Sequence, residues 1–116
     1  MMGLDIKKNL LDREKNIYQI VLRGELDAHT FEDLQFELEG LIDKDVNNII
    51  IDMHGVEYVS SACLGVIAAN HATVAGSGGG LYLFGVSKDI YEVFKTMGLS
   101  DMLNIVDTRA DAVARF

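Results

Sequence analysis

Residues 48–67 read NIIIDMHGVEYVSSACLGVI, and this stretch decides the fold. Its three consecutive isoleucines leave no polar face, which is typical of a central strand covered on both sides. Gly55 is expected to end that strand, and Ser60 or Ser61 can then cap a helix that runs from about residue 61 to residue 75. A serine hydroxyl at a helix N-terminus lies among free backbone N–H groups. The stretch therefore predicts a buried strand, a turn, and a helix that begins with an exposed hydroxyl.

The residues before this stretch predict two strands and a helix. Alternating apolar side chains indicate a half-buried strand over 4–10. A more apolar run predicts a central strand over 17–23, which Gly24 ends. An acidic amphipathic helix follows, with Asp27 or Thr30 as its cap. The apolar positions of this helix have helical spacing: Phe31, Leu34, Leu38, Leu41 and Ile42.

The residues after the stretch complete a small α/β pattern. A glycine-rich turn over 76–80 leads into a strand over 81–86, and a helix follows that Gly98 closes. A short extended piece over 102–106 and a last helix end the pattern. The order β-β-α-β-α-β-α predicts a small mixed sheet of about four or five strands flanked by about four helices, with right-handed crossovers. We expect one domain over residues 1–116.

Composition and charge exclude several kinds of partner. The net charge is −8 and the pI is about 4.6, which disfavours binding to nucleic acid or to an anionic membrane surface. The single cysteine, Cys63, cannot form an internal disulfide, which is typical of a reducing cytosol. Residues 1–8 lack the apolar run of a signal peptide, and no segment reaches the roughly 20 apolar residues of a membrane-spanning helix. We therefore expect a cytoplasmic protein without membrane insertion.

Three other chemistries have little support in the residues. His29, His54 and His71 show no metal-ligand spacing, and Cys63 has no second cysteine, so no metal is expected. The glycines of 76–80 lack the lysine and the following helix of a phosphate-binding loop. A serine between strand and helix suggests a hydrolase, but Gly-x-Ser-x-Gly is absent and the chain leaves little room for a triad and a substrate pocket. We expect neither a cofactor nor enzymatic activity.

Three segments, in this order, resemble the STAS domain of bacterial anti-sigma factor antagonists: GELD at 24–27, IIIDM at 49–53 and VSSACLG at 59–65. The resemblance implies a small mixed sheet flanked by helices. It also implies that a serine at the N-terminus of the second helix is phosphorylated by an anti-sigma factor that is a serine/threonine protein kinase. The unphosphorylated form would bind this kinase and so release a sigma factor to regulate transcription. A protein serine phosphatase would restore the unphosphorylated form.

The motif of that family usually reads Asp-Ser-Ser/Thr-Gly-Leu-Gly, and the pair at 64–65 fixes its register here. This register places Ser61 at the phosphorylated serine, and Ser60 remains the competing acceptor. It also shows two departures, because Ser60 stands at the aspartate position and Cys63 at the first glycine position.

The resemblance further implies a partner-binding surface on loop 55–60 and the start of the second helix, together with the loop aspartate of the family, which falls on Asp27. The implied contact residues are Asp27, Ser60, Ser61, Ala62 and Leu64. The two departures from the motif leave an alternative function open. The chain would then be an unphosphorylated STAS scaffold, a subunit of a lipid-transport or stress-signalling complex.

Overall fold

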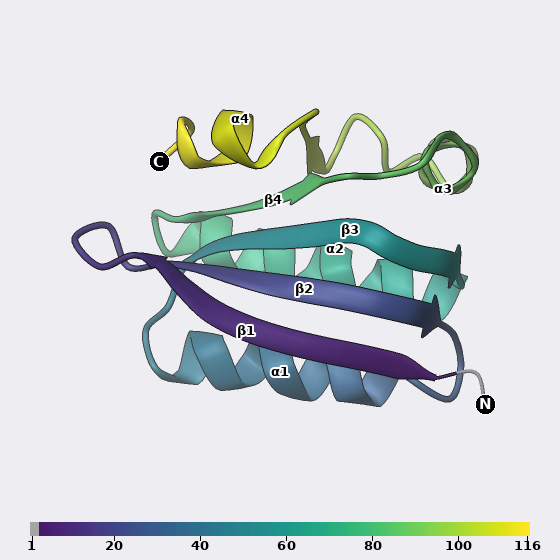
Figure 1. Cartoon of the computed structure of the whole chain (residues 1–116), viewed down its shortest axis with the longest axis horizontal. Coiled ribbons are helices and arrows are strands. Elements are labelled where there is room, and N and C mark those ends of the chain that lie inside the picture. The colour runs from purple at the N-terminus through teal and green to yellow at the C-terminus, as the bar shows by residue number, and fades with distance from the viewer. Residues whose placement is uncertain (1–2) are drawn as a thin grey trace.

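The computed structural model describes residues 3–116; Met1 and Met2, which open the segment considered for a signal peptide, lie outside the described residues. Five strands form one sheet in the order β1-β2-β3-β4-β5 (Figure 1). β1 is antiparallel to β2, and the other neighbouring strands are parallel. The elements are β1 (Leu4–Asp12), β2 (Ile17–Leu26), α1 (Phe31–Asp43), β3 (Asn48–Val59), α2 (Ser61–Gly76), β4 (Gly80–Phe84), α3 (Lys88–Thr96), β5 (Asn104–Ile105) and α4 (Arg109–Val113). The predicted fold class, a small mixed sheet with flanking helices, is confirmed.

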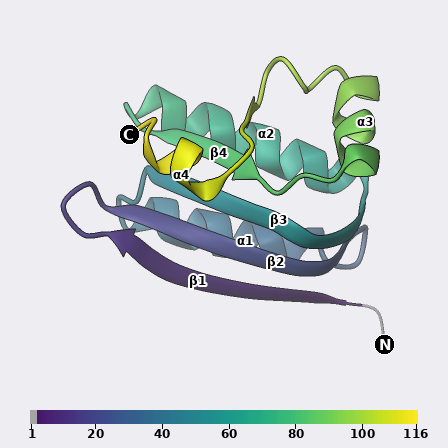
Figure 2. The same cartoon turned by 45° about the horizontal axis from the view of Figure 1, so that its top comes forward.

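Helices cover both faces of the sheet. α1 and α2 lie side by side against one face, whereas α4 lies against the other (Figures 1 and 2). The isoleucines of β3 alternate between the two resulting cores: Ile49 and Ile51 belong to the larger one, and Ile50 belongs to the smaller one under α4. All three side chains are fully buried. This confirms the prediction of a central strand and explains why it has no polar face.

Two glycines lie inside strands, which corrects the prediction that they end them. Gly24 has φ +113°, and an added Cβ there would overlap the Gly3 carbonyl oxygen. An added Cβ at Gly55 would lie 2.9 Å from the Leu22 carbonyl oxygen. Glycine at these positions lets the neighbouring strands stay close where the register between β2 and β3 shifts. β3 therefore continues to Val59 and leads directly into α2.

Two smaller details also differ from the predictions. β4 ends at Phe84, because Gly85, with φ +72°, turns the chain out of the sheet. Residues 55–59, expected as part of a loop, belong to β3. The partner surface predicted on loop 55–60 is therefore built on the end of a strand, and only Ser60 connects this strand to α2.

Candidate functional site

Ser60 forms the cap of α2. Its backbone is extended, with φ −100° and ψ 164°, and its Oγ accepts a hydrogen bond from the Cys63 N–H at 3.4 Å. An aspartate side chain at this position would supply the same acceptor, so serine preserves the capping function of the residue it replaces in the family motif. Of the two serines that could cap α2, Ser60 is therefore the cap.

Ser61 is the first residue of α2, and it is exposed to solvent. The first N–H groups of a helix have no partner within the helix, and they carry the positive end of its dipole. A negative group on the Ser61 hydroxyl would therefore be electrostatically favourable for the helix. The structure places this hydroxyl where the register predicted it, on the surface at the start of α2.

The loop before α1 is held by its own side chains. Asp27 Oδ1 accepts hydrogen bonds from the backbone N–H groups of His29 at 2.8 Å and Thr30 at 3.1 Å. Thr30 Oγ1 donates to the Glu25 carbonyl oxygen at 2.7 Å and accepts from the Asp27 N–H at 2.9 Å. Thr30 occupies the cap position of α1, while the Asp27 side chain makes the bonds that hold the turn. Both predicted cap residues therefore take part in starting α1.

Hydrogen bonds join this loop to the start of α2. The Ser60 N–H donates to the Leu26 carbonyl oxygen at 2.7 Å, and the buried Cys63 Sγ donates to the Asp27 carbonyl oxygen at 3.5 Å. Burial raises the pKa of the Cys63 thiol, the hydrogen bond with Ser60 opposes this shift, and the charge of Asp27 adds to it. The thiol thus stays protonated at neutral pH and remains a donor. The structure brings Asp27 and Ser60 together at one junction.

The remaining two predicted contact residues differ in exposure. Ala62 is exposed beside Ser61. Leu64 has none of its surface exposed and packs in the larger core. The expectation that Leu64 contacts a partner is therefore corrected: its side chain stabilises the fold and offers a partner no surface.

Replacing Ser60 with alanine is expected to lower the free energy of unfolding by about 1 kcal/mol, because the Cys63 N–H loses its acceptor. Ser60→Asp keeps an acceptor at the cap, so its free energy of unfolding should lie within about 0.5 kcal/mol of that of the natural chain. Urea unfolding monitored by circular dichroism measures both changes. Equal destabilisation by the two substitutions would contradict the capping role.

A polar network on the opposite face of the sheet was not predicted. Arg109 at the start of α4 donates from Nε to Gln19 Oε1 at 2.6 Å, and its Nη2 lies 3.8 Å from Asp52 Oδ2. Gln19 Nε2 donates to Asn9 Oδ1 at 3.2 Å, and His54 Nδ1 lies 2.8 Å from Asp52 Oδ1. The sequence signal was a glutamine inside an apolar strand, but its partner is 90 residues away. The network ties α4 to three strands.

Within residues 3–116, no helix combines the length and the apolar character needed to cross a membrane. The same part of the chain holds no cluster of three or more His, Cys, Asp or Glu side chains placed to bind a metal ion.

The fold and the site together define a small α/β domain whose candidate site is an exposed surface at two neighbouring strand–helix junctions. The sequence profile of the STAS domain family matches residues 10–112. The chain belongs to this family.

Individual relatives agree with that assignment. The anti-sigma-B factor antagonist of Staphylococcus aureus is 27% identical over 104 residues, which cover 90% of this chain and 94% of the relative. An anti-sigma factor antagonist from Mycobacterium paratuberculosis has a similar structure, with a TM-score of 0.85 at 18% identity over 97% of this chain and 93% of that one.

The Bacillus protein SpoIIAA, an anti-sigma factor antagonist, has been solved in two forms that share this fold. The unphosphorylated form has a TM-score of 0.79 at 21% identity, over 96% of this chain and 95% of that one. The phosphorylated form has a TM-score of 0.72 at 20% identity, over 96% of this chain and 98% of that one. At these identities the likeness concerns the fold.

Proposed function

We propose that this chain is an anti-sigma factor antagonist, a cytoplasmic protein-binding module switched by phosphorylation of Ser61. In its unphosphorylated form it binds an anti-sigma factor that is also a serine kinase, and this releases a sigma factor. A protein serine phosphatase restores the binding form. The module is regulatory and has no catalytic role of its own. The names of its relatives support this function, as does the match of nearly the whole chain to the STAS domain family.

The observation that carries the proposal is the exposed hydroxyl of Ser61 at the start of α2, next to the Asp27 loop. A phosphate there adds close to two negative charges at the positive end of the α2 dipole, so the fold tolerates it. The same charges, placed in a contact surface, must be desolvated or must face the partner, and either effect opposes binding. Phosphorylation can therefore switch binding off without unfolding the domain.

Phosphate transfer tests this proposal directly. The purified protein is incubated with ATP and, one at a time, with each serine kinase anti-sigma factor encoded in its source genome. Mass spectrometry of the digest should locate one phosphate on Ser61, which is lost in Ser61→Ala and retained in Ser60→Ala. Phosphate on Ser60 alone would move the switch by one residue, and no phosphate with any kinase would refute it.

A constitutive STAS scaffold is the second candidate, favoured by the serine and the cysteine that replace the usual aspartate and glycine of the motif. It predicts that Ser61→Ala leaves assembly intact, and that purification of the native complex yields an ATPase or a transporter subunit. Stable binding of a kinase, lost when Ser61 carries phosphate, would exclude this alternative.

A further inference from the structure

The outer surface of α2 carries no charged side chain. Its 16 residues, SACLGVIAANHATVAG, include no Asp, Glu, Lys or Arg. A helix at the surface of a protein ordinarily shows charged and polar residues on its solvent side. On α2 the exposed positions are small or weakly polar: Ser61, Ala62, Gly65, Ala69, Ala72, Thr73, Ala75 and Gly76. Small side chains allow the backbone of a second helix to come close.

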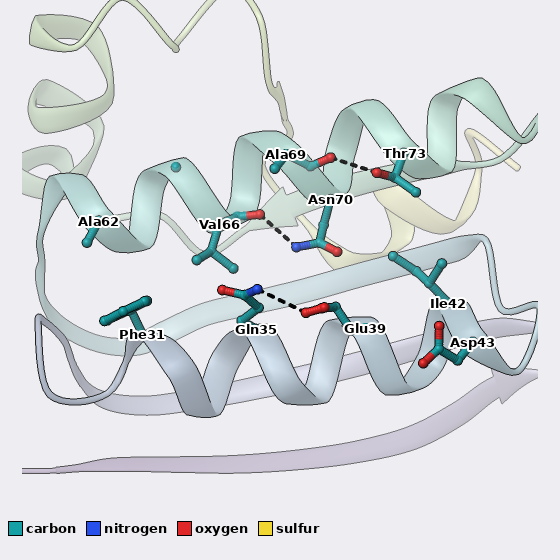
Figure 3. Close-up of a pocket in the computed structure, with 11 residues that line it drawn as sticks. Phe31, Gln35, Glu39, Ile42, Asp43, Ala62, Val66, Ala69, Asn70 and Thr73 are labelled. Carbon is teal, nitrogen blue, oxygen red and sulfur yellow. Dashed lines mark hydrogen bonds between the residues drawn. The ribbon is translucent and has the colours of Figure 1, made fainter.

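A groove of about 570 Å³ lies between α1 and α2, and Figure 3 shows it open between the two helices. Its two ends differ in character. Phe31 and Ala62 lie at the end next to Ser61, whereas Asp43 and Thr73 lie at the far end. The groove is thus apolar near the proposed phosphorylation site, whereas its far end combines the apolar Ile42 with the acidic Asp43.

Asn70 gives the groove an unused hydrogen-bond acceptor. The residue is only 8% exposed, and its Nδ2 donates to the Val66 carbonyl oxygen at 2.8 Å (Figure 3). Within the described part of the chain no donor bonds its Oδ1, which lies in the space between the helices. The Asn70 Oδ1 is accessible to solvent from the groove, so it can accept a hydrogen bond from a donor on whatever fills the groove.

No contact among residues 3–116 requires glycine at position 65. Gly65 lies inside α2, where glycine is less favourable than alanine, and an added Cβ would have no heavy atom within 4 Å. Because Gly65 has no side chain, the α2 backbone is accessible from the groove at this position. This is the residue expected where a second backbone packs closely on the helix.

Charge decides which occupant fits. Glu39 and Asp43 line the α1 side of the groove, α2 is neutral, and the whole chain has a net charge of −8. A second copy of this chain would bring another acidic α1, so self-association through this surface is opposed by repulsion. A helix with lysine or arginine residues at one end is complementary to the acidic end of the groove.

We infer that the groove between α1 and α2 receives an amphipathic helix of the anti-sigma factor, which rests on the function proposed above. The helix presents small or apolar residues to Gly65 and Ala69 and basic residues to Glu39 and Asp43. The groove follows α2 from Ala62 to Thr73, so the docked helix has about three turns. The apolar end of the groove lies beside Ser61. A phosphate on Ser61 would have to be desolvated against this apolar surface when the helix docks, so phosphorylation releases the helix.

Two matched pairs of variants test the inference, with isothermal titration of the unphosphorylated protein against the anti-sigma factor that phosphorylates it. Ala69→Leu fills the groove and should weaken binding by about tenfold or more, whereas Ala72→Leu, exposed on α2 outside the groove, should bind like the natural chain. Asp43→Lys should weaken binding more than Asp33→Lys, which makes the same charge change on α1 outside the groove.

Four results would overturn the inference or part of it, and they are distinguishable. If Ala69→Leu binds like the natural chain and Ser61 is still phosphorylated, the groove is not the docking site, while the proposed function stands. Equal losses of affinity in Asp43→Lys and Asp33→Lys would show that the acidic end of the groove makes no specific contact and that the effect is a general electrostatic attraction. A natural chain that neither binds nor is phosphorylated by any serine kinase anti-sigma factor refutes the proposed function and the groove together. Sedimentation showing a dimer that Ala69→Leu dissociates would assign the groove to a second copy.

Discussion

Replacing Ser61 with aspartate is expected to weaken binding of the anti-sigma factor by about 30-fold or more, while the domain stays folded. The aspartate places a negative charge at the first position of α2, on the surface proposed to meet the partner. A buried charge without a partner, or one that faces a like charge, costs at least about 2 kcal/mol, which corresponds to this loss of affinity. The same charge at a helix N-terminus stabilises the helix by about 0.3–1 kcal/mol. Binding and stability should therefore move in opposite directions.

The matched control for this substitution is Ser87→Asp. Ser87 caps α3 as Ser60 caps α2, accepting a hydrogen bond from the Ile90 N–H at 3.2 Å, and aspartate retains that function. The control adds one negative charge at another helix N-terminus, so it separates the position of the charge from its mere presence. Isothermal titration and thermal unfolding of both variants provide the comparison. Binding by Ser61→Asp at the affinity of the natural chain would contradict the switch.

Replacing Leu64 with alanine should strongly lower the free energy of unfolding of the domain. The side chain is fully buried in the larger core, and truncating such a leucine costs about 2–5 kcal/mol. This is a large part of the roughly 5–15 kcal/mol that stabilises a domain. Because Leu64 offers a partner no surface, the molecules that remain folded should bind the anti-sigma factor with the natural affinity. Urea unfolding measures the first effect, and titration well below the unfolding midpoint measures the second.

Leu64→Met is the control for that substitution. Methionine keeps most of the buried volume, so the loss of stability should stay below about 1.5 kcal/mol. A Leu64→Ala protein that is as stable as the natural chain would place Leu64 on the surface. Weakened binding without destabilisation would restore it to the list of partner contacts.

The elements were predictable where local sequence alone decides them. Three adjacent isoleucines can be buried together only in a strand covered on both faces, and the structure distributes them between two cores. Glycines were misread, because the same residue ends a strand or allows two strands to approach closely. Which of these occurs at Gly24 and Gly55 depends on neighbours that the local sequence does not reveal.

The position of the site was predictable from the sequence, but the role of each residue in it was not. Adjacent serines at a helix start are equivalent by pattern, and only the hydrogen bond from Cys63 to Ser60 separates the cap from the exposed hydroxyl. Leu64 shares one face of α2 with Ile67 and Ala68, so helical spacing alone indicates that it points inward. The partner contact assigned to Leu64 came from the family resemblance and did not take this spacing into account. The network around Arg109 depends on contacts between segments 90 residues apart, which no local pattern contains.

The bond from the Cys63 thiol to the Asp27 carbonyl has a consequence for the thermodynamics of association. Together with the bond from Ser60 to Leu26, it fixes the two junctions relative to each other in the free protein. Ordering flexible loops on complex formation costs conformational entropy, about 0.5–1.5 kcal/mol for each immobilised side chain. Because these bonds already exist in the free protein, the surface proposed for recognition should need little further ordering when a partner binds. Weakening this bond, as Cys63→Ala would, should appear as a less favourable entropy of association.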